Sequence, residues 1–276
     1  MNSSPPFLSI IVPVLNEAAL LGEFLGSLRR LGGGLEIIVV DGGSSDGSRQ
    51  IAESLADRVV AAPRGRALQM SAGAEIARGE VLWFLHADAD VLANSIDSIR
   101  MALDNPRVAG GCFRLRYPRA EAIYRVSDSL GNLGVKVFGF ALGDHGIFCR
   151  REAFVSVGGY PDVPILEDAE LYRRLQRIGR VQQVGERIVS DPRTFEKYGR
   201  YRTTTVYFLI LALYVAGVPI AWLNWIYRRF HSRSRQARVA SAAASFSHVP
   251  RSQSLPAVVG CTSRAPRSQV ALGNGY

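Results

Sequence analysis

The sequence predicts an α/β fold in which a mostly parallel, twisted sheet has helices on both faces. Three observations carry this prediction. Over about the first hundred residues, short apolar runs alternate with segments that have the periodicity of amphipathic helices. The runs are apolar at most positions, as expected of strands that are covered on both faces. Most of the runs also end in a polar or glycine-rich cluster, which is typical of a strand that leads into a loop.

The order of elements begins with a βαβα unit. Residues 8–14 form the first expected strand, and residues 17–30 place leucines and Phe24 at the spacings of a helix with one apolar face. A second strand is expected at residues 36–40. It leads through a turn rich in glycine, serine and aspartate into a helix at residues 48–56.

The alternation then continues toward the middle of the chain. A short strand is expected at residues 58–62, a helix of small residues at 67–77 and a strand at 81–85. Asn94 is a suitable cap for the next helix. Residues 108–117 have the composition of a longer strand.

The second half of the sequence is less regular. A helix is expected at residues 121–138, followed by a glycine-rich loop at 139–146 and a short strand at 147–150. After a further loop, a helix that is opened by acids is expected at residues 168–178. We expect one main domain at residues 1–200, because a single α/β domain of about 200 residues is common.

An apolar helical segment is expected at residues 201–230. Residues 203–227 contain no charged side chain, and this length suits a bilayer span, which needs about 20 apolar residues. Gly217-Val218-Pro219 interrupts the run, and this pattern is typical of one helix ending and another beginning. One interpretation is therefore two short helices that pack on the domain or dock on a membrane, and the other is a single span.

The remaining residues, 231–276, are expected to form a disordered basic tail, because they are rich in serine, alanine, arginine and proline without periodicity. The net charge of the chain is +9. Residues 1–196 hold 22 basic and 24 acidic side chains, a balance of −2, whereas residues 197–276 hold 11 basic side chains and no acidic one. We expect no nucleic-acid partner, because the basic excess lies outside the main domain. It suits the anionic face of a membrane instead.

The cysteines bear on the location of the protein. Cys112, Cys149 and Cys261 are far apart and form no Cys-x-x-Cys pair, so neither a disulfide framework nor a zinc site is expected. The N-terminal residues also lack the basic and apolar regions of a signal peptide. We expect a cytoplasmic location, either in solution or at the inner face of the cell membrane.

Polar residues follow three of the expected strands. Asn16 and Glu17 follow the first strand, Asp41 follows the second, and a cluster from His86 to Asp90 follows the strand at 81–85. Ligands bind beyond the carboxyl ends of the strands in sheets of this kind, so these side chains should meet at one site. Asp41 suits an acceptor for a nucleobase N–H, although an acid before glycine is also a common turn former.

Two carboxylates in the third cluster suit a metal ion. Asp88 and Asp90 stand two residues apart just after a buried strand, and carboxylates are the hard oxygen ligands that Mg²⁺ and Mn²⁺ prefer. Such a cation would hold a diphosphate and stabilise the charge that develops as it leaves. The structural alternative is that Asp90 caps a turn and His86 packs in the core.

Two further groups complete the candidate site. Glu167 and Asp168 open a helix, where acids are favoured on structural grounds alone, but the preceding loop would carry them over the sheet edge, where a base could reach an acceptor hydroxyl. Arg64 and Arg66 precede a helix at a position where phosphates bind readily, although isolated arginines are usually solvated. The glycine motifs of dinucleotide-binding and P-loop proteins are absent from the sequence.

Taken together, these residues resemble the inverting family-2 glycosyltransferases, which have the GT-A fold. The resemblance covers about residues 7–200 and lies in four segments that follow the family's order and spacing: residues 11–17 (IVPVLNE), 40–46 (VDGGSSD), 84–88 (FLHAD) and 166–168 (LED). Residues 64–73 and 143–148, together with the Glu167-Asp168 segment, resemble motifs of the subgroup known as radical-SAM/selenodomain-associated transferases.

The resemblance implies a role for each motif. Asp41 would contact the base of a nucleotide-diphosphate sugar, and His86 stands where the family usually has the first acid of its metal motif. Asp88 would hold the metal, and Asp168 would be the catalytic base with Glu167 beside it. The other residues implied to contact the donor are Pro13, Asn16, Glu17, Arg64, Arg66 and Arg193, and Asp144 and His145 would lie on the acceptor or diphosphate side.

The predicted activity is the inverting transfer of one sugar from a nucleotide-diphosphate sugar to an acceptor that the sequence does not specify, with a lipid as one option and a membrane surface as a further partner. The Gln-x-x-Arg-Trp motif of processive synthases is missing, which favours one sugar per encounter over a polymer. Two alternatives stay open. A nucleotidyltransferase would use the same acid-bound metal, and a non-catalytic membrane-associated protein would depend on residues 203–227.

Overall fold

The computed structural model describes residues 5–32, 34–119 and 121–230. The chain divides into a first compact unit, Met1–Ser234, and a second unit, Arg235–Tyr276. All described elements belong to the first unit. Residues 231–276, for which the sequence predicts a disordered tail, lie outside the described residues.

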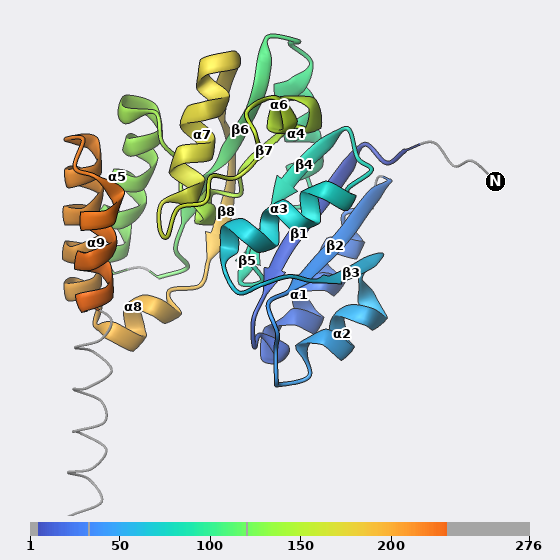
Figure 1. The fold of residues 1–276 in the computed structure, drawn as a ribbon, viewed down its shortest axis with the longest axis horizontal. Coiled ribbons are helices and arrows are strands. Elements are labelled where there is room, and N and C mark those ends of the chain that lie inside the picture. The colour runs from blue at the N-terminus through green and yellow to red at the C-terminus, as the bar shows by residue number, and fades with distance from the viewer. Residues whose placement is uncertain (1–4, 33, 120, 231–276) are drawn as a thin grey trace, which may run out of the picture. The chain divides into compact units, whose positions relative to one another are not determined.

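The first unit is built on one eight-stranded sheet (Figure 1). The strands in chain order are β1 (Leu8–Val14), β2 (Leu35–Asp41), β3 (Arg58–Ala61), β4 (Val81–Phe84), β5 (Ala89–Asp90), β6 (Val108–Arg116), β7 (Phe148–Arg150) and β8 (Arg180–Ser190). Their order across the sheet is β3-β2-β1-β4-β7-β6-β8-β5. The four strands from β3 to β4 are parallel and so are β6 and β8, whereas β7 and β5 are antiparallel to their neighbours. The predicted mostly parallel sheet is confirmed.

Helices cover both faces of this sheet. They are α1 (Ala18–Arg30), α2 (Ser48–Leu55), α3 (Arg66–Ile76), α4 (Ser95–Leu103), α5 (Ala122–Phe138), α6 (Arg151–Ser156), α7 (Glu167–Ile178), α8 (Arg193–Tyr198) and α9 (Arg200–Val215). Residues of α1, α2 and α4 form one apolar core with Ile10 and Val12, and residues of α3, α6 and α7 form a second core with Ile11. Neighbouring residues of β1 thus point to opposite faces, which explains why every residue of the strand is buried and all but Ser9 are apolar.

Strand β8 is the main element that the periodicity of the sequence does not predict. It pairs in parallel with β6, but the register shifts between Cys112 and Arg114 of β6. This irregularity breaks the alternation of inward and outward side chains on which a strand prediction depends. Val181 and Gln183 are less exposed than their neighbours at the start of β8, whereas Val184, Ile188 and Ser190 are the buried residues after them, so the alternation changes phase within the strand.

The apolar segment at residues 201–230 forms two helices rather than one. Helix α9 ends at Val215, a turn follows in which Gly217 has a φ of 84°, and residues 220–230 are helical again. This is the two-helix arrangement that Gly217-Val218-Pro219 predicts. Within the described part of the chain, no helix has both the length and the apolar composition to cross a membrane.

The sheet brings the predicted polar clusters to one edge. Strands β1, β2 and β4 are parallel neighbours, and Val14 at the end of β1 is in register with Asp41 at the end of β2. The loops that follow these strands therefore leave the sheet side by side, as expected for a binding site of this fold class.

Candidate active site

A cavity of about 850 Å³ opens at this edge of the sheet. It is lined by the ends of β1, β4 and β8, by the starts of α3 and α7, by a short turn at Gly143–His145, and by residues of α8, α9 and the helical segment 220–230. Most of the predicted site residues line it: Pro13, Glu17, Arg66, His86, Asp88, Asp144, Glu167, Asp168 and Arg193. Five do not, namely Asn16, Asp41, Arg64, Asp90 and His145.

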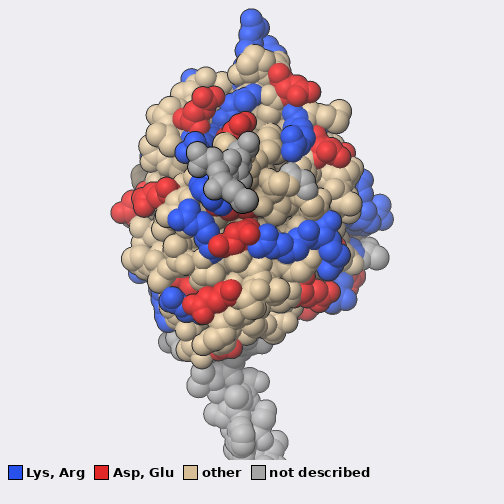
Figure 2. Space-filling view, turned by 90° about the vertical axis from the view of Figure 1, so that its right-hand side faces the viewer, with Lys and Arg blue, Asp and Glu red and all other residues tan. Residues whose placement is uncertain are grey.

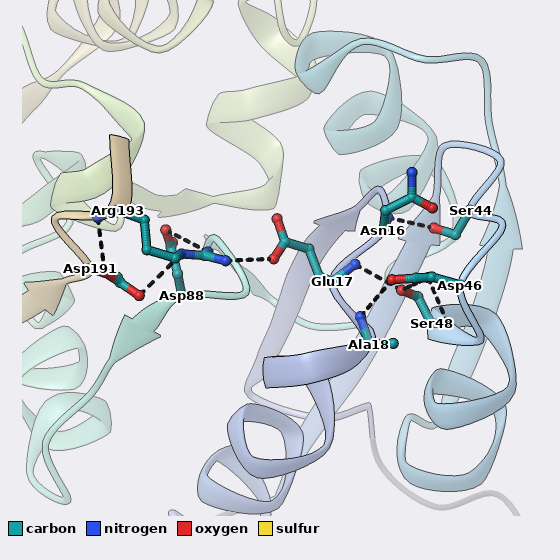
Figure 3. Close-up of polar contacts among 9 residues, drawn as sticks. All are labelled: Asn16, Glu17, Ala18, Ser44, Asp46, Ser48, Asp88, Asp191 and Arg193. Carbon is teal, nitrogen blue, oxygen red and sulfur yellow. Dashed lines mark hydrogen bonds and ion pairs between the residues drawn. The ribbon is translucent and has the colours of Figure 1, made fainter. Parts of the chain in front are cut away.

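Asn16 joins the loop after β1 to the loop after β2 (Figure 3). Its backbone N–H donates to Ser44 Oγ at 3.0 Å, and its side-chain Oδ1 accepts from the Ser45 N–H at 2.8 Å. Asn16 has a φ of 58°, a left-handed conformation that asparagine tolerates better than most residues. These contacts hold the loop in place and set the position of Glu17 on the cavity wall.

Asp46 supports the same loop, and the sequence patterns did not identify it. Its carboxylate accepts from the Ser48 hydroxyl at 2.6 Å and from the Ala18 N–H at 3.0 Å, and these hydrogen bonds lower its pKa. The Glu17 N–H in turn donates to the Ser48 hydroxyl at 2.8 Å (Figure 3). The first turn of α1 is thus capped by residues that precede and begin α2.

Asp41 is buried at the end of β2. Its Oδ1 accepts from the Ser44 N–H at 3.0 Å, which is the turn-forming contact expected of an acid before glycine. This contact occupies one of its oxygens. The nucleobase contact that the resemblance implies stays a prediction.

Arg193 stands among three carboxylates (Figure 3). Its guanidinium lies 3.1 Å from Glu17 Oε2, 3.2 Å from Asp88 Oδ2 and 3.1 Å from Asp191 Oδ2. These acids come from the loop after β1, the loop after β4 and the end of β8. The sequence does not predict Asp191 as a site residue, because it follows β8, the strand that the periodicity of the sequence does not predict.

Asp168 is a buried carboxyl group in the first turn of α7. The Tyr160 hydroxyl donates to its Oδ1 at 3.0 Å, and Tyr160 is itself buried. Burial, together with the neighbouring charge of Glu167, raises the pKa of Asp168 to about 6, while the charges of His86 and Arg66 and the bond from Tyr160 act in the opposite direction. A carboxylate of this kind can accept a proton close to neutral pH.

Glu167 is buried beside Asp168 and has a cationic partner. Arg66 Nε, at the start of α3, lies 3.3 Å from Glu167 Oε1. The residue before this pair, Leu166, has a φ of 62° and a ψ of 23°, a conformation that is unfavourable for leucine. Backbone strain of this kind is concentrated at functional sites. Here it belongs to the turn that sets the direction of α7.

Gly143 packs against the carboxylate of Asp168. A Cβ atom at this position would lie 2.8 Å from Asp168 Oδ2 and 2.2 Å from His86 Nε2, so no other residue fits without displacing these groups. His86 Nε2 is buried and has no hydrogen-bond partner among the described residues. The backbone at Gly143 therefore holds the wall of the cavity close to both side chains.

Asp144 and His145 differ in their surroundings. Asp144 lines the cavity, and its Oδ2 accepts from the Tyr117 hydroxyl at 3.3 Å. His145 is buried, its Nδ1 accepts from the Leu142 N–H at 3.4 Å, and burial lowers its pKa to about 4. Only Asp144 is therefore exposed to the cavity.

Two other predicted residues lie apart from the cavity lining. The Arg64 guanidinium is directed to the Gly43 carbonyl oxygen at 3.5 Å, and it is exposed. Asp90 is an exposed residue of β5, where it pairs with Val189 of β8. The roles predicted for them in donor and metal binding stay predictions.

The wall around Asp88 suits a divalent cation that is shared with a ligand. The carboxylates of Asp88 and Asp191 already flank one cationic group, the guanidinium of Arg193. Within the described ranges, no three histidine, cysteine, aspartate or glutamate side chains form a metal-binding group by themselves. Mg²⁺ and similar ions are commonly held by one or two carboxylates together with substrate phosphates, and the residues present fit that arrangement.

The sequence matches the family described as "Glycosyl transferase family 2" over residues 9–149. Among curated proteins, it is similar to the succinoglycan biosynthesis protein ExoA of Rhizobium meliloti, with 32% identity over 201 residues, which cover 62% of this chain and 58% of the relative. It is also similar to the beta-monoglucosyldiacylglycerol synthase of Trichormus variabilis, with 25% identity over 197 residues, which cover 63% and 42%. The chain spans about half the length of these relatives.

Solved structures show the same fold. The mannosyltransferase PcManGT from Pyrobaculum calidifontis, in complex with GDP-Man and Mn²⁺, has a TM-score of 0.59 and 20% identity, covering 90% of this chain and 84% of that one. The glucosyl-3-phosphoglycerate synthase from Mycobacterium tuberculosis, in complex with Mn²⁺, UDP-glucose and phosphoglyceric acid, has a TM-score of 0.56 and 18% identity, covering 78% and 81%. The fold is the GT-A type found in nucleotide-diphospho-sugar transferases.

Proposed function

The chain belongs to the family-2 glycosyltransferases, and we propose that it moves one sugar from a nucleotide-diphosphate sugar to an acceptor hydroxyl with inversion at the anomeric carbon. The observation that carries this proposal is the cavity, because it places a buried carboxyl group with a raised pKa, Asp168, in the same space as Asp88. One group can accept a proton and the other can hold the charged end of the donor.

Asp168 is the proposed base. It takes the proton of the acceptor hydroxyl, whose oxygen forms the new bond to the anomeric carbon while the bond from that carbon to the diphosphate oxygen breaks. The bonding electrons leave with the diphosphate. Tyr160 orients the Asp168 carboxylate through its hydrogen bond, and Gly143 leaves room for it.

The donor side is formed by the loop after β1 and by the residues around Asp88. Pro13 and Glu17 line the cavity at the end of β1, and Arg193 is a cationic side chain of the cavity that would contact the diphosphate. Asp88, with Asp191 nearby, would hold a divalent cation. When bound, such a cation supplies stabilisation of the charge that develops on the leaving diphosphate. The two solved structures with Mn²⁺ support this assignment.

The acceptor and the location are also part of the proposal. One relative is named for a glucosyldiacylglycerol, and the cavity has an apolar wall formed by Tyr207, Ile210 and Leu211 of α9, which supports an acceptor with a lipid part. We place the protein at the cytoplasmic side of the membrane, in keeping with the free, buried Cys112 and Cys149. Membership of the radical-SAM/selenodomain-associated subgroup rests only on the sequence motifs at residues 64–73, 143–148 and 167–168.

Ligand-dependent thermal stability tests the donor side. Sugar nucleotides such as GDP-mannose, UDP-glucose and UDP-GlcNAc are compared with and without Mn²⁺. A ligand at about 100 times its dissociation constant adds about 2.7 kcal/mol to the free energy of unfolding, which is readily measured. We expect stabilisation by one donor class that requires Mn²⁺ and is lost in Asp88→Asn. Asp90→Asn serves as the matched variant and reports whether that second acid contributes. Stabilisation of Asp88→Asn equal to that of the unsubstituted protein would contradict the assignment.

A further inference from the structure

Helix α5 presents an apolar stripe to solvent. Val126, Leu130, Leu133 and Val137 are spaced four, three and four residues apart, so they lie along one side of the helix. Their exposed fractions are 48, 42, 48 and 61%. The other side of the helix is already packed against the protein through buried residues such as Tyr124. A surface helix normally has polar residues on its outer side, so this stripe needs a partner.

The charges beside the stripe have one sign. Arg125 and Lys136 are exposed and lie along one edge of it by the helical period, and neither side chain has an ion-pair partner among the described residues. The one acid within α5, Asp128, is half-buried and accepts from the Tyr117 N–H at 3.0 Å. The acid just before the helix, Glu121, is paired with Arg200 at 3.0 Å.

The neighbouring helices also present apolar side chains to solvent. Helix α9 lies beside α5 (Figure 1), and the segment 220–230 packs on α9 through Leu223. That segment exposes two tryptophans, Trp222 at 67% and Trp225 at 58%. Tryptophan is enriched where proteins meet the interface of a bilayer, because its ring is apolar with one polar edge.

The basic residues of α9 and of the segment 220–230 lie at one end of this helix pair. The Arg202 guanidinium lies 4.8 Å from the centre of the Phe230 ring, so the start of α9 and the end of the segment 220–230 are close together. Residues 197–230 contain five basic side chains and no acid, namely Lys197, Arg200, Arg202, Arg228 and Arg229. The charge pattern differs on the side of the first unit that is at the right in Figure 1. Figure 2 shows basic and acidic side chains interspersed on that side.

We propose that this surface, formed by the stripe of α5 with Arg125 and Lys136 and by the exposed side of α9 and residues 220–230, docks on an anionic lipid bilayer. Apolar side chains bordered by cations, with tryptophans nearby, are what an interfacial protein presents to anionic lipid. A second copy of this surface would place cations against cations. The sequence adds six arginines and no acid at residues 231–276, which strengthens attraction to anionic lipid.

The position of this surface gives it a role in transfer. Tyr207, Ile210 and Leu211 of α9, together with Tyr227, belong to the same helix pair and also line the cavity that holds Asp168. Docking would bring the cavity to the surface of the bilayer, where the hydroxyl of a lipid acceptor lies. This last step rests on the proposed function, but bilayer binding itself does not.

Binding of the full chain to vesicles tests the proposal. The protein is sedimented with vesicles of phosphatidylcholine alone or of phosphatidylcholine mixed with phosphatidylglycerol, at low and high salt, without any donor. We expect binding to the phosphatidylglycerol vesicles that is at least about tenfold stronger than to phosphatidylcholine alone, and weaker at high salt. Equal binding to both kinds of vesicle, or none, would overturn the proposal.

Variants locate the contact. L133E/V137E should weaken vesicle binding at least about tenfold, because it removes apolar area and adds negative charge. M101E/V155E is the matched control, since Met101 and Val155 are exposed by 74 and 70% but lie on α4 and α6, and it should bind as the unsubstituted protein does. Thermal unfolding checks that both variants fold.

Two further outcomes separate the possible partners and the two proposals. If L133E/V137E binds vesicles as well as the control does, or if it converts a dimer of the unsubstituted protein into a monomer on sedimentation equilibrium, the bilayer assignment is wrong. Asp168→Asn should bind vesicles normally. A loss of sugar transfer in that variant with unchanged vesicle binding would therefore test the catalytic proposal alone.

Discussion

Asp168 has surroundings that suit a base working near neutral pH. The carboxylate is the active form of a base, so activity should be present above the pKa and lost below it. Because burial and the charge of Glu167 raise this pKa to about 6, we expect kcat/KM to fall about tenfold per pH unit below about pH 6 and to be level above it. The measurement is a pH–rate profile with saturating Mn²⁺. A profile that stays level down to about pH 4, near the ordinary value of 3.8, would contradict the assignment.

In the proposed reaction, Tyr160 acts through Asp168. Its hydroxyl donates at 3.0 Å to a buried carboxylate, a bond that favours the charged form and lowers the pKa. In Tyr160→Phe the acidic limb of the pH–rate profile should move to higher pH by about one unit, as expected for the loss of a charge-assisted hydrogen bond. A purely structural role would lower stability without moving the limb.

Tyr172→Phe is the matched control for this variant. Tyr172 is also a buried tyrosine, and it is close in the sequence to the carboxylates of α7. Its hydroxyl, however, lies 3.7 Å from Cys112 Sγ and not beside Asp168. The acidic limb should stay in place in this variant. A shift of equal size in both variants would show that the limb reports general loosening of α7 and not the bond to Asp168.

The residues of the site were predictable to different degrees. The place of Asp88 and Asp168 on the cavity wall could be predicted, because one follows a strand and the other lies at the start of a helix, where the sequence pattern changes. Tyr160 and Asp191 could not, since their roles depend on hydrogen bonds and ion pairs made only in the folded chain. The turn contact of Asp41 could be predicted, because it is made with a residue close by in the sequence.

At the scale of elements, helix α3 packs unusually close to the sheet. A Cβ atom on Gly73 would lie 2.5 Å from Ile11 Cγ2 and 2.9 Å from Val40 Cγ2, and both contacts are in the core. We expect Gly73→Ala to lower the free energy of unfolding by about 1–2 kcal/mol, because overpacking outweighs the better helix propensity of alanine. Urea unfolding measures this change.

Gly22→Ala provides the control with the opposite expected sign. Gly22 lies within α1, and a Cβ atom there would meet nothing closer than 3.8 Å. Alanine should therefore leave stability unchanged or raise it by up to about 1 kcal/mol. Equal destabilisation by both substitutions would mean that close packing of α3 on the sheet is not the cause.

The elements that the sequence predicts well are those with a clear period. Strands β1, β2 and β4 have mostly apolar runs and helix α1 has a regular apolar face, and the structure contains all four. Strand β8 has a register shift against β6 and was missed. The break at Gly217 agrees with one of the two interpretations of the apolar segment, and it could be anticipated because backbone conformation at glycine is a local property.

At the scale of the whole molecule, long-range contacts assemble the cavity. Arg193 of α8 joins Glu17, 176 residues earlier, and Asp88, 105 residues earlier, so this wall of the cavity forms only when α8 packs against the edge of the sheet. No local pattern encodes such contacts. The uneven distribution of charge also belongs to this scale, since five of the basic side chains that follow residue 196 lie in α8, α9 and residues 220–230.

The central claim is that Asp168 serves as the base for sugar transfer in a cavity that holds the donor at Asp88. The most direct test is to measure the nucleotide product released from the donor that the stability screen selects, in the presence of a panel of lipid acceptors. The unsubstituted protein should release a nucleoside diphosphate, and Asp168→Asn should do so about 10²–10⁴ times more slowly while the dissociation constant of the donor changes little. Release of pyrophosphate, or an undiminished rate in Asp168→Asn, would contradict the account.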